Sequence, residues 1–430
     1  MRQPAPDLWW ALAEGLGLGW AVGVAVFTSI LFGLSLAGVP GAVGVYPAAL
    51  CTAAGVGLLV RFVGAERRGP SWAVPEGRSV PLLAALCIAA AQVALSTWMT
   101  LRAPFAAEDS WAFWGLKARM FAGDGLPPGY FHDPTFLYSH PDYPLNLPLA
   151  EGTIFRLEGG WGEPLAALFG PACLAALALL FAVGLARLYG PTVAALGLTV
   201  LILLPMVPAS AASGYADLPL AMYLGSAALY LLLWWRGGHR SDAVVMGLLL
   251  GGAIWTKKEG TAVAAVALAL YGAGELLRRH GPISPRLRRL GWGIVPALAL
   301  PLPWELLLHG TRPLGRDFLP LTPMNLVGHL DRLPGIAAEF VLQMLSFAHW
   351  SLFWGMVGIV VALTIRRLSW PGYGLLALLT GQLSVYGCSY ILSSWGDYRV
   401  HIWTSLDRLL LQAAPVALLL LVEASTTWSR

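Results

Sequence analysis

Long apolar runs separated by short polar connections make up most of this chain. A helix of about 20 apolar residues crosses a hydrocarbon core of ~30 Å, and most of the runs approach or exceed that length. The pattern therefore predicts an all-α polytopic membrane protein. The twelve runs lie near residues 16–37, 43–63, 80–101, 164–187, 191–209, 217–235, 243–256, 260–277, 290–308, 347–365, 372–393 and 408–424.

The composition supports this prediction and excludes other classes of protein. Hydrophobic residues make up 57% of the chain and charged residues only 12%, about half of the roughly 25% that is usual in soluble domains. So little charge excludes a soluble enzyme, a nucleic-acid-binding domain and a secreted disulfide scaffold. The first apolar run lacks a small-residue cleavage site, which predicts a retained span and not a signal peptide. Four cysteines lie inside apolar runs without a Cys-x-x-Cys pair and indicate no zinc site or disulfide: Cys51, Cys87, Cys173 and Cys388.

The basic residues are concentrated in alternate connections. The positive-inside rule assigns short basic connections to the cytoplasm, which predicts a plasma (inner) membrane protein with both termini cytoplasmic. The predicted inner positions are Arg2, Arg61, Arg67, Arg68, Arg78, Arg187, Arg236, Arg240, Arg278, Arg279, Arg286, Arg288, Arg289, Arg366, Arg367 and Arg430. The predicted outer segments are 102–163, 210–217, 257–260, 310–346 and 394–408. All three lysines of the chain fall on outer segments, either by chance or because they form an anion site: Lys117, Lys257 and Lys258.

The outer segment 102–163 is too rich in aromatic residues for a disordered linker. Connections of this length in compact folds are usually functional, so we expect ordered, short interfacial helices. Residues Ser110 to Phe121 can form one of them. Its predicted membrane-surface face consists of Trp111, Trp114, Ala118 and Phe121, with Lys117 and Arg119 off that face.

Two carboxylates, Glu108 and Asp109, stand at the N-terminus of that predicted helix. A carboxylate is favoured there by free N–H groups and by the helix dipole. Capping by itself explains an Asp at this position. Capping and catalysis are compatible, however, because one carboxylate oxygen can cap while the other faces a substrate.

Three further places put polar residues at the ends of apolar runs. Asp217 opens the sixth run, either as a helix N-cap or facing a partner, because an Asp that faces lipid is costly. Lys257-Lys258-Glu259 follow a small-residue helix, where snorkelling is the ordinary interpretation of the lysines. His401 and Arg408 lie in the segment that opens the last run, and Arg408 is there either an interfacial anchor or a phosphate ligand.

Taken together and in this order, these segments resemble glycosyltransferase family 39 of the GT-C superfamily. Its members include protein O-mannosyltransferases and the lipid A aminoarabinose transferase. In the family, a span that opens with Asp-x-Pro is followed by a small-residue helix that ends in Leu-Thr-Lys-Gly or similar. The corresponding segments here are Glu108-Asp109 in the large outer loop, ASGYADLPLAMYLGSAALYLL, GLLLGGAIWTKKEG and SLDRLLLQAAP. The resemblance covers residues 100–270 well and the rest loosely.

The resemblance implies a GT-C-type bundle of about 12 transmembrane helices and a membrane glycosyltransferase. The expected donor is a polyprenyl-phosphate-linked sugar, and the acceptor is a hydroxyl of a protein, lipid or glycan, with inversion at the anomeric carbon. Asp109, with Glu108 second, is the expected general base. The expected donor-phosphate ligands are Lys257, Lys258, Arg408 and Arg119, and the expected substrate-orienting residues are Asp217, Glu259, His401 and Tyr143.

The chain departs from the family pattern in three ways. Two spans precede the usual first span, the acidic pair reads Glu-Asp instead of Asp-Glu, and Asp142-Tyr143-Pro144-Leu145 replaces a phosphate-binding Lys-Pro-Pro element. Two alternative functions are a polyprenyl-linked glycan ligase or polymerase, and a twelve-span transporter or flippase. Transporters usually show internal repeats, and we find none here.

We expect no cofactor. A divalent metal site is a weaker alternative, and its candidate ligands match no known spacing: His132, Asp133, His140 and Asp142. The predicted division of the chain is an N-terminal transmembrane hairpin over 1–79, a GT-C core over 80–277 that includes the outer loop 102–163, and a C-terminal transmembrane region over 278–430.

Overall fold

The computed structural model describes residues 8–66, 79–123, 126, 129–159, 163–277, 283–311 and 317–428. Over these ranges the chain is helical, and its only β-pairing is an isolated bridge between Phe318 and Ser393. The helices are α1 (Leu8–Leu36), α2 (Gly41–Glu66), α3 (Val80–Arg102), η2 (Ser110–Gly115), α4 (Leu116–Ala122), η3 (Pro134–Ser139), α5 (Asn146–Leu157), α6 (Glu163–Ala167), α7 (Phe169–Tyr189), α8 (Pro191–Leu203), α9 (Met206–Ser213), α10 (Asp217–Gly237), α11 (Arg240–Thr256), α12 (Lys258–Leu277), α13 (Ile283–Ala299), α14 (Leu302–Thr311), α15 (Pro323–Gly328), η4 (Leu330–Arg332), α16 (Leu333–Met344), α17 (Phe347–Trp350), α18 (Phe353–Thr364), η5 (Ile365–Arg367), α19 (Trp370–Ile391) and α20 (Tyr398–Trp428).

The protein is a multi-pass helical membrane protein. Within the described ranges, 8 helices are long and apolar enough to cross a membrane, and two helix pairs bent by 58° and 57° raise the number to at most 10. The bent pairs are α8 with α9 and α13 with α14. Both breaks contain a proline, Pro205 and Pro301 respectively, which removes a backbone donor.

The predicted count of twelve spans is not reached by these helices. α11 has 17 residues and α18 has 12. At 1.5 Å per residue, α18 rises only ~18 Å, well short of a hydrocarbon core. The apolar run near 347–365 is interrupted because Ser351, between α17 and α18, has a φ of +52°, which a helix does not accept.

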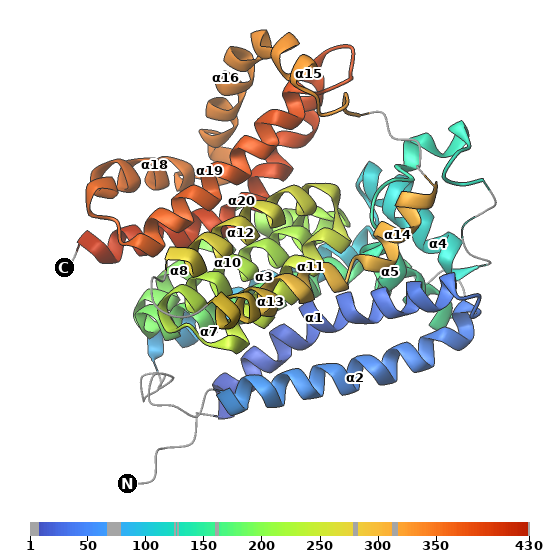
Figure 1. The fold of residues 1–430 in the computed structure, drawn as a ribbon, viewed down its shortest axis with the longest axis horizontal. Helices are drawn as coiled ribbons and strands as arrows, with labels where there is room; N and C mark the ends of the chain where they lie inside the picture. The colour runs from blue at the N-terminus through green and yellow to red at the C-terminus, as the bar shows by residue number, and fades with distance from the viewer. Residues whose placement is uncertain are drawn as a thin grey trace.

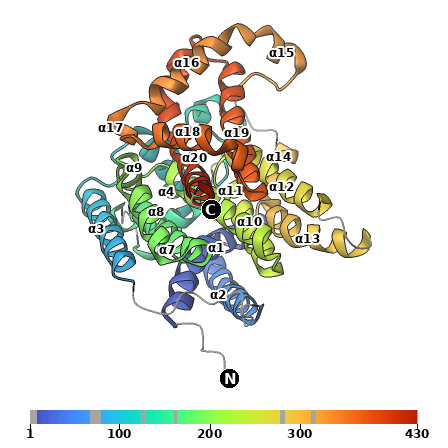
Figure 2. The same ribbon diagram turned by 90° about the vertical axis from the view of Figure 1, so that its left-hand side faces the viewer.

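Helix α10 lies at the centre of the bundle, and its membrane-length window is 100% buried. It packs against α11, α20 and α7, and Figure 2 shows α20 close to α10 and α11 in the middle of the view. Small residues make these contacts close, as is usual between membrane helices. A Cβ added at Gly225 of α10 would overlap Pro415 of α20, and one at Gly247 of α11 would overlap the backbone of α13.

The periphery of the bundle is formed by the N-terminal helices and by α15 and α16 (Figure 1). α1 and α2 run side by side along one edge, and α15 and α16 stand off from the opposite edge (Figure 1). α1 packs on α7 and α11, whereas only 22% of the membrane-length window of α2 is buried. α2 is therefore a peripheral helix, and α1 connects it to the core.

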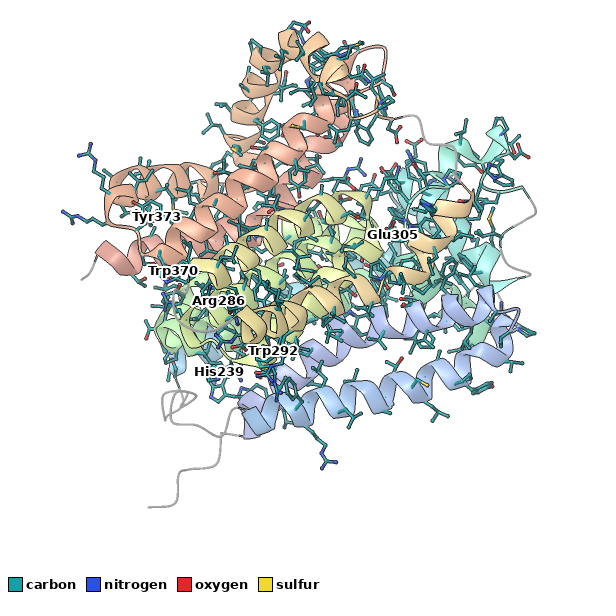
Figure 3. All side chains as sticks on the ribbon, viewed as in Figure 1. His239, Arg286, Trp292, Glu305, Trp370 and Tyr373 are labelled. Atoms are coloured by element: carbon teal, nitrogen blue, oxygen red, sulfur yellow. The ribbon has the colours of Figure 1, made fainter. Side chains whose placement is uncertain are left out.

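The bundle has two polar ends. We call the end where α1 begins and α20 ends the termini end, and the end formed by η2, α4 and α5 the loop end (Figure 1). At the termini end, Glu14 accepts hydrogen bonds from both terminal nitrogens of Arg187 at 2.6 Å, and Glu423 pairs with Arg236. His239 and Arg286 also lie toward this end, whereas Glu305 of α14 lies toward the loop end (Figure 3).

The segment 102–163 forms most of the loop end, and its helix near 110–121 differs from the prediction. It consists of a π-helical turn, η2, followed by α4. Trp111 is 53% exposed while Trp114 and Ala118 are buried, and Lys117, predicted to lie off the apolar face, is fully buried. A π turn contains more residues than an α turn, so it rotates Trp111 away from Trp114 and turns Lys117 inward.

Candidate functional site

Lys257 is the single residue between two helices. α11 ends at Thr256, α12 begins at Lys258, and Lys257 itself is extended, with φ −156° and ψ 152°. Gly260 allows this sharp junction, because a Cβ there would overlap the Ala253 carbonyl. The junction directs Lys257 toward the start of α10.

Asp217, the first residue of α10, receives that lysine. Its Oδ1 lies 2.9 Å from Lys257 Nζ and accepts a hydrogen bond of 2.6 Å from Gln412 of α20. Its side chain is 2% exposed. The N-cap interpretation is wrong, because Ala216 holds the N-cap position. Asp217 instead faces polar partners, as the cost of a carboxylate at membrane depth requires.

Arg408 of α20 lies between two carboxylates from distant parts of the chain. It pairs with Asp109, and its NH1 lies 3.9 Å from Asp217 Oδ2. Its NH2 donates to the Thr404 carbonyl at 2.9 Å, and its guanidinium lies 4.6 Å from the Tyr215 ring centroid. With a side chain 18% exposed and carboxylate partners, Arg408 is not a lipid-facing anchor.

Asp109 and Glu108 have different surroundings. Asp109 occupies the N-cap position of η2 but makes no capping hydrogen bond, because its carboxylate pairs with Arg408. The Asp109 side chain is 22% exposed. Glu108 is exposed and forms no ion pair with any residue that the structure describes. Asp109 thus holds the predicted N-cap position, but its side chain does not cap the helix.

These contacts form one chain of alternating charges at the loop end. Lys257 also lies 3.1 Å from Glu259 Oε1, so the chain extends beyond Asp217. It joins segment 102–163, α20, α10 and the α11–α12 junction. Its members in order are Asp109, Arg408, Asp217, Lys257 and Glu259. We call it the charge chain.

Lys258 lies in a neighbouring cluster and not in the charge chain. Its ammonium pairs with Asp142 and lies 5.4 Å from the Tyr143 ring centroid, and its side chain is 39% exposed. Of the four predicted phosphate-binding cations, Lys257 and Arg408 thus share a carboxylate, and Lys258 has its own.

Two stacked ring pairs flank Asp317 next to this cluster. His140 stacks on Tyr143 with centroids 4.7 Å apart, and its Nδ1 lies 3.0 Å from Asp317 Oδ2. His401 stacks on Trp395 at 4.6 Å, and the Trp395 indole donates to Asp317 Oδ1 at 3.4 Å. Burial by itself would raise the pKa of Asp317, but the hydrogen bonds from His140 and Trp395 lower it below its ordinary value. We call Asp317 and the rings of His140, Tyr143, Trp395 and His401 the ring cluster. The predicted orienting residues Tyr143 and His401 belong to it.

Lys117 is hydrogen-bonded to the backbone of the ring cluster. Its ammonium donates to the His140 carbonyl at 2.9 Å, and His140 has a φ of +49°. Burial lowers the pKa of Lys117 from 10.5 to about 7, against an opposing effect of Asp142. Lys117 therefore fixes a strained backbone position, and it is not a member of the charge chain.

Arg119 and the four metal candidates are not members of the charge chain. Arg119 pairs with Glu163 and does not join the charge chain. Among the described residues, no group of three or more His, Cys, Asp and Glu side chains could hold a metal ion. Three of the four candidates have other partners, namely Asp133 with Thr135, His140 with Asp317, and Asp142 with Lys258.

A buried hydrogen-bonded network supports the lysine junction. Asn146 of α5 donates to the Thr256 hydroxyl at 2.9 Å and to the Tyr223 hydroxyl at 3.3 Å. Its carbonyl oxygen accepts from Thr28 of α1 at 2.7 Å. The network joins α1, α5, α10 and α11, and it fixes the residue that precedes Lys257.

Sequence reasoning missed two members of the site, Gln412 and Tyr215. Gln412 lies four residues after Arg408 and therefore on the same helix face. A polar residue inside an apolar run is a signal for a buried partner. The Tyr386 hydroxyl donates to Gln412 Oε1 at 2.8 Å, which leaves the amide nitrogen to donate to Asp217. Tyr215, a lone aromatic residue in a short connection, carries no such signal.

Two cavities of about 400 Å³ lie away from the charge chain. One is bordered by the α1–α2 turn, α4 and α5, and includes Arg156. The other lies at the termini end beside Arg236 and Glu423. No member of the charge chain lines either cavity.

The charge chain offers two cations and a partly exposed carboxylate at one place. Cations that share carboxylates are suited to bind an anion that replaces one of them, and a partly exposed carboxylate is suited to accept a proton. Comparison of the full protein sequence and structure with family models, curated proteins and solved structures finds no match.

Proposed function

We propose that this protein is a membrane glycosyltransferase that moves a sugar from a polyprenyl-phosphate donor to an acceptor hydroxyl. The acceptor oxygen attacks the anomeric carbon, and the bond from that carbon to the phosphate oxygen breaks. Asp109 takes the proton of the acceptor hydroxyl, and the polyprenyl phosphate leaves with the bonding electrons. Attack opposite the leaving group inverts the anomeric centre.

The observation that carries the proposal is the charge chain. A leaving phosphate needs cations that stabilise its developing charge, and Arg408 and Lys257 are fixed around one buried carboxylate. Asp109 is the more exposed of the two carboxylates whose side chains pair with that of Arg408, and it serves as the proton acceptor in this proposal. Asp217 orients both cations in this proposal, and Lys258 and Arg119 lie further from the reaction.

Spare acceptors in the charge chain and in the neighbouring Lys258 cluster support a sugar as the transferred group. Glu259 Oε2 and Asp142 Oδ1 are buried and accept no hydrogen bond from the described part of the chain. A buried acceptor without a donor is costly, and sugar hydroxyls are donors. The stacked rings of Trp395 and His401 lie at the same end of the molecule. In this proposal they provide a surface on which a sugar ring can pack.

The finer topology belongs to this proposal. Cytoplasmic termini and an active site on the outer face of the plasma membrane would place the charge chain at the outer headgroup level. The segregation of Arg187 and Arg236 to the termini end, opposite segment 102–163, agrees with that orientation. A phosphatase fused after Pro144 should be active, and one fused after Arg240 should be inactive.

The function is tested with purified protein in lipid nanodiscs. A pool of radiolabelled polyprenyl-phosphate sugars is supplied with envelope lipids and glycans as acceptors, and transfer of label is measured. Arg408→Gln should lower transfer about 10²–10³-fold, the usual loss when one preorganised charge-stabilising donor is removed. Arg119→Gln, the matched loop arginine, should change it little. Equal loss in both variants, or no transfer by the wild type, would contradict the proposal.

A further inference from the structure

The proposed function needs Asp109 and Arg408 for different tasks, yet the structure pairs them. Asp109 is to accept a proton and Arg408 is to meet the donor phosphate. The guanidinium engages the Asp109 carboxylate directly. The carboxylate oxygen that the guanidinium binds is not available to hydrogen-bond with an acceptor hydroxyl, as a general base must. The pairing therefore holds the proposed base out of use.

The guanidinium of Arg408 is already engaged on several sides. NH1 contacts Asp109 and lies 3.9 Å from Asp217 Oδ2, and NH2 donates to the Thr404 carbonyl at 2.9 Å. The Tyr215 ring lies 4.6 Å from the guanidinium. A phosphate that takes the position facing NH1 must therefore displace Asp109 or Asp217.

Asp109 is the partner that can leave. Asp217 is 2% exposed and is held by Lys257 and Gln412 as well as by Arg408. Asp109 is 22% exposed, and Arg408 is the one side chain in the described part of the structure with which it forms an ion pair. The Asp109 carboxylate thus has access to solvent and a single charged partner to lose.

We propose that a lipid phosphate displaces Asp109 from Arg408, and that this displacement releases Asp109 as the proton acceptor. The inference rests on the proposed function and adds an order of events to it. The phosphate forms charge-assisted hydrogen bonds with the guanidinium, while Asp217 keeps Arg408 and Lys257 in place. Donor binding and activation of the base are then one event.

Competition for one guanidinium has a reciprocal consequence. If phosphate and the Asp109 carboxylate exclude each other on Arg408, removal of the carboxylate charge must strengthen phosphate binding. A catalytically impaired variant would then bind the donor phosphate more tightly than the wild type. A coupling of about fivefold or more is usual for linked sites.

The test measures the affinity for farnesyl phosphate, a short soluble polyprenyl phosphate, of the full chain in neutral-lipid nanodiscs. Asp109→Asn should bind it at least about fivefold more tightly than the wild type. Glu108→Gln removes the same charge at the neighbouring position. Glu108 is exposed and forms no ion pair in the described structure, so the affinity of this variant should equal that of the wild type. Equal affinities of all three proteins, or equal strengthening in both variants, would overturn the inference.

A second measurement uses the wild type alone. Farnesyl phosphate should increase the modification of Asp109 by a water-soluble carbodiimide, mapped by mass spectrometry, because the displaced side chain becomes more accessible. No increase would overturn the displacement. The two proposals fail differently: absence of farnesyl phosphate binding in all three proteins removes both. Tighter binding by Asp109→Asn without sugar transfer by the wild type supports the displacement and removes the transferase function.

Discussion

Buried carboxylates are paired with cations in different ways at the two polar ends of the bundle. At the termini end two carboxylates, Glu14 and Glu423, each have their own arginine, and hydroxyl groups fill the remaining positions. Glu14 binds Arg187 and the Tyr230 hydroxyl, and Glu423 binds Arg236 together with the hydroxyls of Tyr189 and Ser369. At the loop end, Arg408 and Lys257 each contact two carboxylates and share Asp217.

The difference indicates which end can change its partners. A carboxylate with a complete set of private donors loses all of them if it moves, so the termini end is suited to fasten helices together. In the charge chain a carboxylate that leaves can be replaced by another anion, while the shared Asp217 keeps the cations in place. We therefore assign structural work to the termini end and chemistry to the loop end, and four predictions test that assignment.

The largest expected effect is on transfer in Asp109→Asn. A neutral amide cannot accept the proton, and loss of a general base typically costs about 10²–10⁴-fold in rate. The amide can still accept a hydrogen bond from Arg408, so the melting temperature should fall only slightly. Sugar transfer is measured in nanodiscs beside Glu108→Gln, which should retain most of its activity. Loss in Glu108→Gln with full activity in Asp109→Asn would reassign the base.

Arg187→Gln should have the opposite profile. It leaves the buried Glu14 carboxylate without its arginine, and breaking a buried ion pair from one side costs about 3–5 kcal/mol of stability. Transfer per folded molecule should stay unchanged, because Arg187 lies at the termini end. Thermal unfolding and specific activity are measured on the same sample. A fall in specific activity of folded protein would undo the division between the two ends.

Asn146→Ala tests the network under the lysine junction. It removes the buried hydrogen bonds of Asn146 to the hydroxyls of Thr28, Thr256 and Tyr223, at a cost of about 0.5–1.5 kcal/mol for each bond. Lys257 should be less well fixed, so transfer should fall as well. Thr153→Ala on the same helix is the control, because that hydroxyl bonds back to the Leu149 carbonyl of its own helix. Equal melting temperatures of the two variants would count against a network that supports the site.

The smallest effect concerns pH and Lys117. Because its pKa is about 7 in the folded protein and 10.5 ordinarily, the unfolded chain binds more protons between these values. Stability should therefore rise as the pH increases from 7 toward 10. Lys117→Met should remove that part of the rise. Melting temperature is recorded against pH for both proteins, and parallel curves would mean that Lys117 does not titrate in this window.

The sequence predicts those features that depend on local composition and on the cost of placing a charge in lipid. The length of an apolar run and the cost of charge in lipid pointed to the long helices and to Asp217 and Arg408 as side chains that need partners. The sequence could not identify the partner of Arg408, because Asp109 lies 299 residues away and the pairing depends on how the helices pack. The π turn of η2 and the break at Ser351 were also beyond the sequence, since both depend on tertiary packing.

The central position of α20 has a consequence for how the protein is made. α10 leaves the ribosome well before α20, yet α20 supplies Gln412 and Arg408 to Asp217. Until α20 inserts, the carboxylate at the start of α10 lacks two of its partners in a low-dielectric environment. The insertion of α20 thus completes the charge chain and the core together. A ribosome stalled before α20 should expose an immature intermediate to membrane proteases, which would serve as quality control for an assembled site.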